Sequence, residues 1–154
     1  MPTLTFTTEI AVSRQRLWAF HDGTEALQKI TPPGTRVRLV DPPERLTKGA
    51  AFTLVVSQPP IFFPLRWRCE FIAFEPPLRF VDRQVPGQGP FAFWEHEHRF
   101  EDLGPERSRL TDTVQYRVPL GPLGRLADAL FIRRELKAMF AYRHRVTKAT
   151  LESV

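Results

Sequence analysis

Two segments of the chain place polar and aromatic side chains at alternate positions, and these are the residues best suited to chemistry. Side chains two apart on a β-strand point to the same face of a sheet. One face therefore collects Phe80, Asp82, Gln84, Trp94, His96, His98 and Phe100. The charged residues between them, such as Arg83, Glu95 and Glu97, are expected on the opposite, solvated face.

A buried polar group without a partner costs about 1–3 kcal/mol, so a core does not collect such groups by chance. Asp112 and Tyr116 lie in the same phase as Leu110 and Val114 on a later segment and extend the set. These polar side chains either hydrogen-bond to one another or line a cavity that holds water or a ligand. We expect one internal cavity that is shared by Asp82, Gln84, His96, His98, Asp112 and Tyr116.

Three kinds of chemistry are compatible with this set. His96 and His98 can both reach one metal ion, with Asp82 or Asp112 as a carboxylate ligand. The sequence does not fix a fourth ligand, so a hydrogen-bond network is favoured, and no metal and no cofactor are predicted. A His–Asp pair in a dry pocket can also transfer protons, which makes the same four residues the catalytic candidates. Cys69 is expected to be a core thiol.

The abundance of aromatic residues around these polar groups favours a flat, apolar ligand. The predicted ligand-binding residues are Trp67, Phe80, Asp82, Gln84, Trp94, His96, His98, Phe100, Asp112, Tyr116 and Phe140. Arg143, close to Phe140, is expected at the surface, with a clamp on a ligand carboxylate as the alternative. Phe62 and Phe63, in a proline-bounded loop, are candidates for a lid, a partner contact or a membrane contact.

Size and composition predict one globular domain over residues 1–154. The chain is 42% hydrophobic and has a single cysteine, which excludes an internal disulfide. No signal peptide or membrane-spanning run is visible, so a cytoplasmic protein is expected. The net charge of +5 is spread over single arginines, which predicts no specific nucleic-acid binding. A homodimer is compatible with the sequence.

The elements that must position these residues form an α+β order. A strand at 3–12 is followed by a short helix at 14–21 and by a second short helix that Thr24 can cap and that ends near Ile30. Six strands follow, at 36–40, 51–57, 65–74, 79–85, 91–101 and 109–118, joined by short turns that favour an antiparallel meander. After Pro119 to Gly124, one long, largely buried helix is expected over 125–150. A long helix does not fill the concave side of a curved sheet, so a cavity is expected between them.

The pattern resembles the START-like superfamily with the helix-grip fold, nearest to its bacterial cyclase/dehydrase-like ligand-binding branch. Four stretches carry the resemblance: Asp82-x-Gln84, Gly89-Pro90-Phe91-x-x-Trp94-x-His96-x-His98-x-Phe100, Asp112-x-x-x-Tyr116-x-x-Pro119-x-Gly121 and Phe140-x-x-Arg143. The resemblance covers the whole chain. It implies a curved antiparallel sheet of about seven strands around a long C-terminal helix.

The function predicted from the residues and the resemblance is binding of a small hydrophobic, aromatic, polyketide-like or lipid-like molecule, by a carrier or sensor. The alternative is a cyclase, dehydrase or hydrolase that uses the His and Asp residues of the cavity. A weaker alternative is nucleic-acid contact through the basic outer face of the sheet. This superfold hosts transport, sensing and catalysis alike, so the fold does not choose among them.

Overall fold

The computed structural model describes residues 1–58 and 61–153, with the side chains of residues 61 and 62 left aside. Its strands are β1 (Thr3–Ile10), β2 (Arg36–Val40), β3 (Ala51–Gln58), β4 (Ile61–Glu75), β5 (Arg79–Gln84), β6 (Phe93–Gly104) and β7 (Arg107–Arg117). Its helices are α1 (Arg14–His21), α2 (Glu25–Lys29), α3 (Gly121–Ala127) and α4 (Arg133–Glu152), with a π-helical turn at Asp128–Ile132 between the last two.

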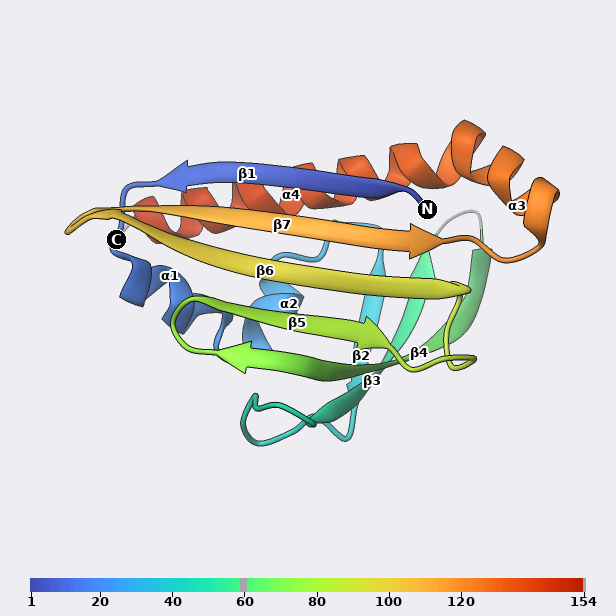
Figure 1. Cartoon of the computed structure of the whole chain (residues 1–154), viewed down its shortest axis with the longest axis horizontal. Helices are drawn as coiled ribbons and strands as arrows, with labels where there is room; N and C mark the ends of the chain where they lie inside the picture. Colours follow the sequence, from blue (N-terminus) through green and yellow to red (C-terminus); the bar gives the residue numbers. More distant parts are fainter. Residues whose placement is uncertain (59–60, 154) are drawn as a thin grey trace.

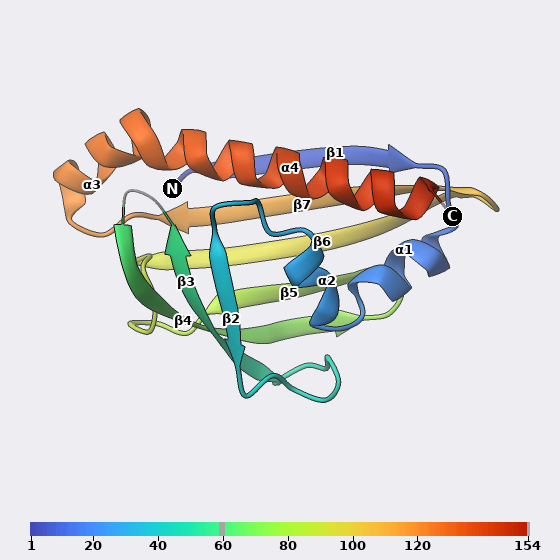
Figure 2. The same cartoon turned by 180° about the vertical axis from the view of Figure 1, so that it is seen from behind.

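The strands form one antiparallel sheet in the order β1-β7-β6-β5-β4-β3-β2 (Figure 1). Hairpins connect consecutive strands from β2 to β7, and β1 closes the order by pairing with β7. Seen from behind, α4 runs along β1 and β7, and α1 and α2 lie on the same side of the sheet (Figure 2). Helix α1 contacts β6 and β7, whereas α2 lies nearer to β5 and β2. The expected curved sheet around a C-terminal helix, with two short helices after the first strand, is confirmed.

Local sequence accounts for the two short helices. The Ser13 side chain accepts a hydrogen bond from the Arg16 backbone N–H and caps α1, as Ser at this position commonly does. Leu17 and Trp18 then pack into the core. Thr24 precedes α2 but its side chain makes no capping hydrogen bond, and Ala26 is the buried residue of this helix.

The C-terminal helix begins four residues earlier than the sequence predicted, at Gly121. The segment from Pro119 to Gly124 was expected to precede the helix, but Pro122 lies in the first helical turn. Proline is tolerated there because the backbone N–H that it lacks would have no partner within the helix. Gly124 is needed in this helix for a steric reason. A Cβ atom at this position would lie 1.9 Å from the Pro119 carbonyl oxygen, so only glycine permits this close approach.

The expectation that this helix is buried over much of its length is wrong for its first part. Leu123, Leu126, Leu130 and Phe131 are more than half exposed. In Figure 1, α3 extends past the end of the sheet, so it has no sheet beneath it. Only Gly124 and Asp128 are buried in this first part. From Leu136 onward one face is buried through Phe140, His144, Thr147 and Leu151.

Strand β4 begins at Ile61, so part of the predicted loop at 58–64 belongs to the sheet. The strand pairing continues to the end of the hairpin, where Gln58 lies opposite Ile61. The side chain of Phe63 is 65% exposed. The expected role of Phe62 lies outside the described side chains.

Two apolar clusters fill the space between the sheet and the helices. One surrounds Trp18 and Phe100 near α1, and the other surrounds Trp94 and Phe140 near the start of α4. The polar residues of β5, β6 and β7 lie between the two clusters. This arrangement divides the core into two apolar ends and one polar layer, and the polar layer is where the candidate site lies.

Candidate functional site

Strand register brings the predicted polar residues together. Asp82 lies opposite His96 across β5 and β6, and His98 lies opposite Asp112 across β6 and β7. Side chains that are opposite or diagonal on one sheet face are close enough to interact. The two histidines and two aspartates therefore form a compact block on the concave face, as the alternation predicted.

Asp112 is the centre of this block and is surrounded by three imidazoles. Its Oδ1 atom lies 2.8 Å from Nε2 of His96 and 3.1 Å from Nδ1 of His98. Its Oδ2 atom lies 2.6 Å from Nε2 of His144, on α4. Burial alone would raise the pKa of Asp112, but the hydrogen bonds from the three histidines hold it well below its usual range. Asp112 is therefore a buried carboxylate that accepts from several N–H groups.

His98 bridges the two carboxylates. Its Nε2 atom lies 2.9 Å from Oδ2 of Asp82, while its other ring nitrogen faces Asp112. Burial lowers the pKa of His98, but the hydrogen bonds to Asp112 and Asp82 outweigh burial and raise it to about 9. At neutral pH His98 is therefore an imidazolium, and both of its N–H groups are held by carboxylates. Its ring also stacks on Phe80, with centroids 4.1 Å apart.

The neighbouring imidazole has the opposite character. Burial, followed by the positive charge of His98, lowers the pKa of His96 below its ordinary value despite its contact with Asp112. The rings of His96 and His98 lie 3.7 Å apart between centroids. A neutral and a protonated imidazole therefore lie side by side.

An internal cavity of about 140 Å³ adjoins this block, between the concave sheet face, α2 and α4. Its wall is mainly apolar and includes Phe52, Leu54, Trp67, Phe71, Phe80, Trp94 and Met139, together with Asp82, His96, His98 and Arg143. A smaller void of about 20 Å³ lies behind the histidines, lined by Asp112, Phe140 and His144 among others. That volume is enough for about one water molecule.

The structure separates the eleven predicted ligand-binding residues into three groups. Six lie in the cavity wall: Trp67, Phe80, Asp82, Trp94, His96 and His98. Asp112 and Phe140 line only the smaller void. Gln84, Phe100 and Tyr116 line neither. The polar network is thus smaller than the six side chains that the alternation suggested.

The three residues outside the cavity have structural partners. The Gln84 side chain bonds to the backbone N–H and C=O of Phe91, across the β5–β6 connection. The Tyr116 hydroxyl donates to Asp128 at 2.6 Å, and Arg133 donates to the other oxygen of the same carboxylate. This bond ties the π-helical turn to the sheet. Phe100 packs against Trp18 in the apolar cluster near α1.

Three residues near the cavity were missed or misplaced by the sequence interpretation. His144 completes the cluster, and its position four residues after Phe140 on one helical face was the available signal. His21 lines both the cavity and the void, and burial lowers its pKa to about 4. Arg143, expected at the surface, instead lines the cavity.

The geometry of the site remains compatible with the metal site that the sequence offered as an alternative. Ligand atoms of Asp82, His96 and His98 all lie within 4.8 Å of one another. In the present arrangement the nitrogens of His98 are committed to the two carboxylates, so a metal ion would have to replace these hydrogen bonds. The residues present are of the type that holds a divalent transition metal, but both ring nitrogens of His98 and Nε2 of His96 already contact carboxylates.

A larger groove of about 990 Å³ lies elsewhere, between α1, α2 and residues 43–47. Residues such as Asp22, Glu25 and Lys29 line it, and none of the histidines belongs to its wall. The aromatic-lined cavity is the better candidate, since ligand sites are concave and mostly apolar with a few placed polar groups.

The antiparallel sheet, the long C-terminal helix packed on it and the cavity between them together define a START-like ligand-binding fold. The model of the family described as "Polyketide cyclase / dehydrase and lipid transport" matches residues 1–152, and the chain belongs to this family. No curated protein matches the chain at the sequence level.

Solved structures share the fold at low sequence identity. A START superfamily protein from Mycobacterium smegmatis has a TM-score of 0.71 and 16% identity, covering 97% of this chain and 98% of its own. Norcoclaurine synthase from Thalictrum flavum, solved with dopamine and hydroxybenzaldehyde, has a TM-score of 0.67 and 16% identity, covering 98% and 87%. The di-domain ARO/CYC BexL has a TM-score of 0.70 and 15% identity, covering 99% and 47%.

Among the described residues, no helix has both the length and the apolarity needed to cross a bilayer.

Proposed function

We propose that the chain is a carrier or sensor that binds a small apolar molecule with an aromatic ring in the cavity between the sheet and α4. The observation that carries this proposal is the cavity itself, which is lined by aromatic side chains next to a buried polar cluster. The family description, which includes lipid transport, and the neighbouring structures with aromatic ligands agree with it.

The volume of the cavity limits the size of the ligand. A dry cavity of about 150 Å³ lined by aliphatic and aromatic side chains binds benzene. The cavity here, at about 140 Å³, suits a molecule with one ring, or two fused rings after small shifts of the wall. Its aromatic side chains offer ring faces and edges against which such a ligand packs.

Calorimetric titration with indole and nitrobenzene tests this proposal. Leu54→Trp fills the cavity from β3 and is expected to abolish binding of both compounds. Val55→Trp is the matched control, because the next residue on a strand points to the opposite face of the sheet. The proposal is wrong if neither compound binds to the unmodified protein, or if the two variants bind them equally well.

A second candidate function is proton transfer on a bound carbonyl compound, as in a cyclase or dehydrase. The observation in its favour is the pair of adjacent imidazoles at the cavity wall, one neutral and one protonated at neutral pH. A neutral imidazole accepts a proton and an imidazolium donates one, which is the pairing that general acid–base catalysis uses. His96 would act as the base. The charged groups next to it would be His98, Asp82 and Asp112.

Hydrogen–deuterium exchange at the α-carbon of 2-indanone, followed by NMR in D₂O, tests this candidate. His96→Gln keeps a hydrogen-bond donor toward Asp112 but does not titrate. A catalyst loses the accelerated exchange in this variant while binding is retained. Exchange no faster than in buffer, or unchanged in the variant, would leave only the binding function.

A further inference from the structure

Arg143 is the one cation of α4 that lines the cavity. It lies one helical turn from Phe140, and its guanidinium carbon is 5.4 Å from the centre of the Phe140 ring. It also lines the small void behind the histidines. Arg143 shares the wall of the cavity with Asp82 and the wall of the void with Asp112. Burial lowers the pKa of Arg143, whereas the charges of Asp112 and Asp82 raise it.

Arg143 nevertheless has no direct partner in the described part of the chain. Its Nε atom is buried without a hydrogen bond, and no carboxylate lies within ion-pair distance of its guanidinium. The nearby carboxylates are already engaged, because their oxygens accept from His96, His98 and His144. The arginines of the outer sheet face differ, since Arg79 and Arg83, for example, are paired with glutamates.

A guanidinium presents several N–H donors in a planar fork that fits a carboxylate through two parallel hydrogen bonds. The buried Nε–H of Arg143 is without an acceptor, which is costly, so a partner inside the cavity is expected. A second unpaired donor of the same wall, the buried indole N–H of Trp67, also requires an acceptor. The unsatisfied polar atoms of the cavity wall are thus donors, and a complementary ligand is rich in acceptors.

We infer that Arg143 binds the carboxylate of the ligand, which makes the ligand a small aromatic acid. This inference rests on the proposed binding function and specifies its ligand class. The ring of the acid lies against the aromatic wall formed by Trp67, Phe80 and Trp94, and the carboxylate points toward α4. Arg143 is then a specificity-determining residue that separates acids from neutral molecules of the same shape.

Pairs of ligands with equal shape and different charge test the inference. Calorimetric titration compares benzoate with nitrobenzene, and 2-naphthoate with 2-nitronaphthalene. We expect each acid to bind at least about tenfold more tightly than its nitro counterpart, the lower end for a charge-assisted hydrogen bond. Arg143→Met keeps the aliphatic stem and is expected to remove this preference, while Arg143→Lys keeps the charge and is expected to retain part of it.

Arg145→Met is the matched control, because Arg145 is exposed on the same helix and lies over Tyr142. It is expected to leave all four affinities unchanged, and circular dichroism of each variant checks that it is folded. Acids that bind no better than their nitro counterparts, or an acid preference that survives in Arg143→Met, would overturn the inference and leave the proposed binding function intact. Failure of all four compounds to bind would overturn the proposed function and the inference with it.

Discussion

Asp112 and His98 show how a buried charge is kept on the concave face of this sheet. The carboxylates of Asp82 and Asp112 each have an imidazole N–H within about hydrogen-bond distance, and His98 contacts both of them. Buried ion pairs contribute little to stability relative to an apolar core, but removal of one member leaves a costly unpaired charge. The cluster therefore locks β5, β6, β7 and α4 into one register around the cavity.

The protonated state of His98 predicts how stability depends on pH. Its pKa in the folded protein, about 9, is above the ordinary value of 6.5. The stabilisation is therefore complete below about pH 6.5 and is lost as the pH rises toward 9. Urea unfolding of the protein and of His98→Gln at pH 6, 7.5 and 9 measures this. We expect the difference in unfolding free energy to shrink by on the order of 1–3 kcal/mol between pH 6 and pH 9.

Glu106→Gln, in the exposed hairpin between β6 and β7, is the control and should show the same pH profile as the unmodified protein. The difference in unfolding free energy between the unmodified protein and His98→Gln could instead stay constant with pH or grow toward pH 9. Either result would show that His98 is not an imidazolium between two carboxylates.

Much of the site was predictable at the residue scale, because strand alternation determines which side chains share a face. Period two places Asp82, His96, His98 and Asp112 on one face, and the register of β5, β6 and β7 then brings them together. Gln84 and Tyr116 share that face but lie toward the far end of the strands. There Gln84 bonds to the backbone of Phe91, and Tyr116 bonds to Asp128. The contact between Tyr116 and Asp128 depends on the angle at which the helix leaves the sheet, which the strand pattern does not contain.

At the scale of elements, the C-terminal helix has two parts with different roles. The residues of α3 extend beyond the sheet, and their leucines are exposed, whereas α4 buries one face against β1 and the cavity. The sequence predicted the existence of the helix because residues 125–150 contain no glycine or proline. It did not predict where burial starts, since the apolar residues recur at helical spacing in both parts and the length of the sheet decides which are covered.

Two leucines on this helix test the division. Leu136 is 8% exposed and Leu126 is 55% exposed. Truncation of a buried leucine to alanine costs about 2–5 kcal/mol, whereas surface substitutions change stability by about 0.5 kcal/mol or less. Chemical unfolding should therefore show a large loss for Leu136→Ala and almost none for Leu126→Ala. Equal losses would mean that α3 is covered in solution.

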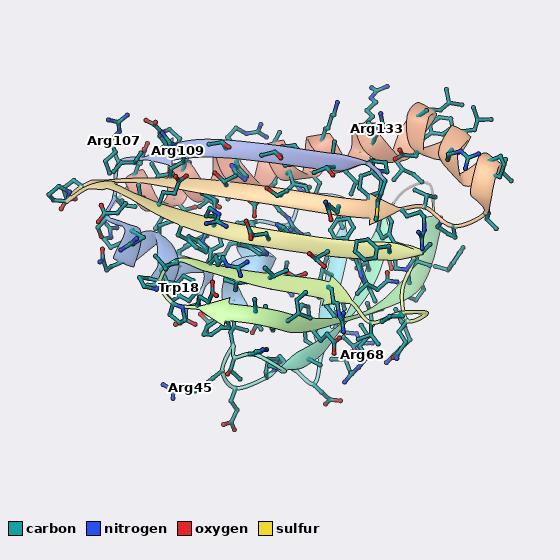
Figure 3. The ribbon with its side chains drawn as sticks, viewed as in Figure 1. Trp18, Arg45, Arg68, Arg107, Arg109 and Arg133 are labelled. Carbon is teal, nitrogen blue, oxygen red and sulfur yellow. The ribbon has the colours of Figure 1, made fainter. Side chains whose placement is uncertain are left out.

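Across the whole molecule, positive charge is dispersed. Figure 3 shows Arg107 and Arg109 near the carboxyl end of β1, whereas Arg45, Arg68 and Arg133 lie well apart from them and from one another. Several arginines are paired with acidic residues: Arg79 contacts Glu75 and Glu97, and Arg109 contacts Glu9. Paired surface charges contribute little and present no continuous basic surface to a polyanion.

We therefore expect only weak nucleic-acid binding despite the net charge of +5. Fluorescence anisotropy with labelled single-stranded and double-stranded DNA and RNA oligonucleotides measures it. Binding should be weaker than about micromolar at physiological salt and should fall steeply as salt increases. Micromolar or tighter affinity that persists at physiological salt would instead favour the nucleic-acid function.

The central claim is that an aromatic molecule binds inside the cavity, and the three tryptophans of the chain test it directly. Trp67 and Trp94 line the cavity, whereas Trp18 is buried against Phe74, Phe80 and Phe100 outside it. The measurement is a ¹H–¹⁵N NMR titration of protein labelled at tryptophan with unlabelled indole, each side-chain N–H being assigned from a Trp→Phe variant. We predict large, saturable shifts for Trp67 and Trp94 and a small shift for Trp18. Saturable binding that moves only Trp18, or that moves none of the three resonances, would contradict the account.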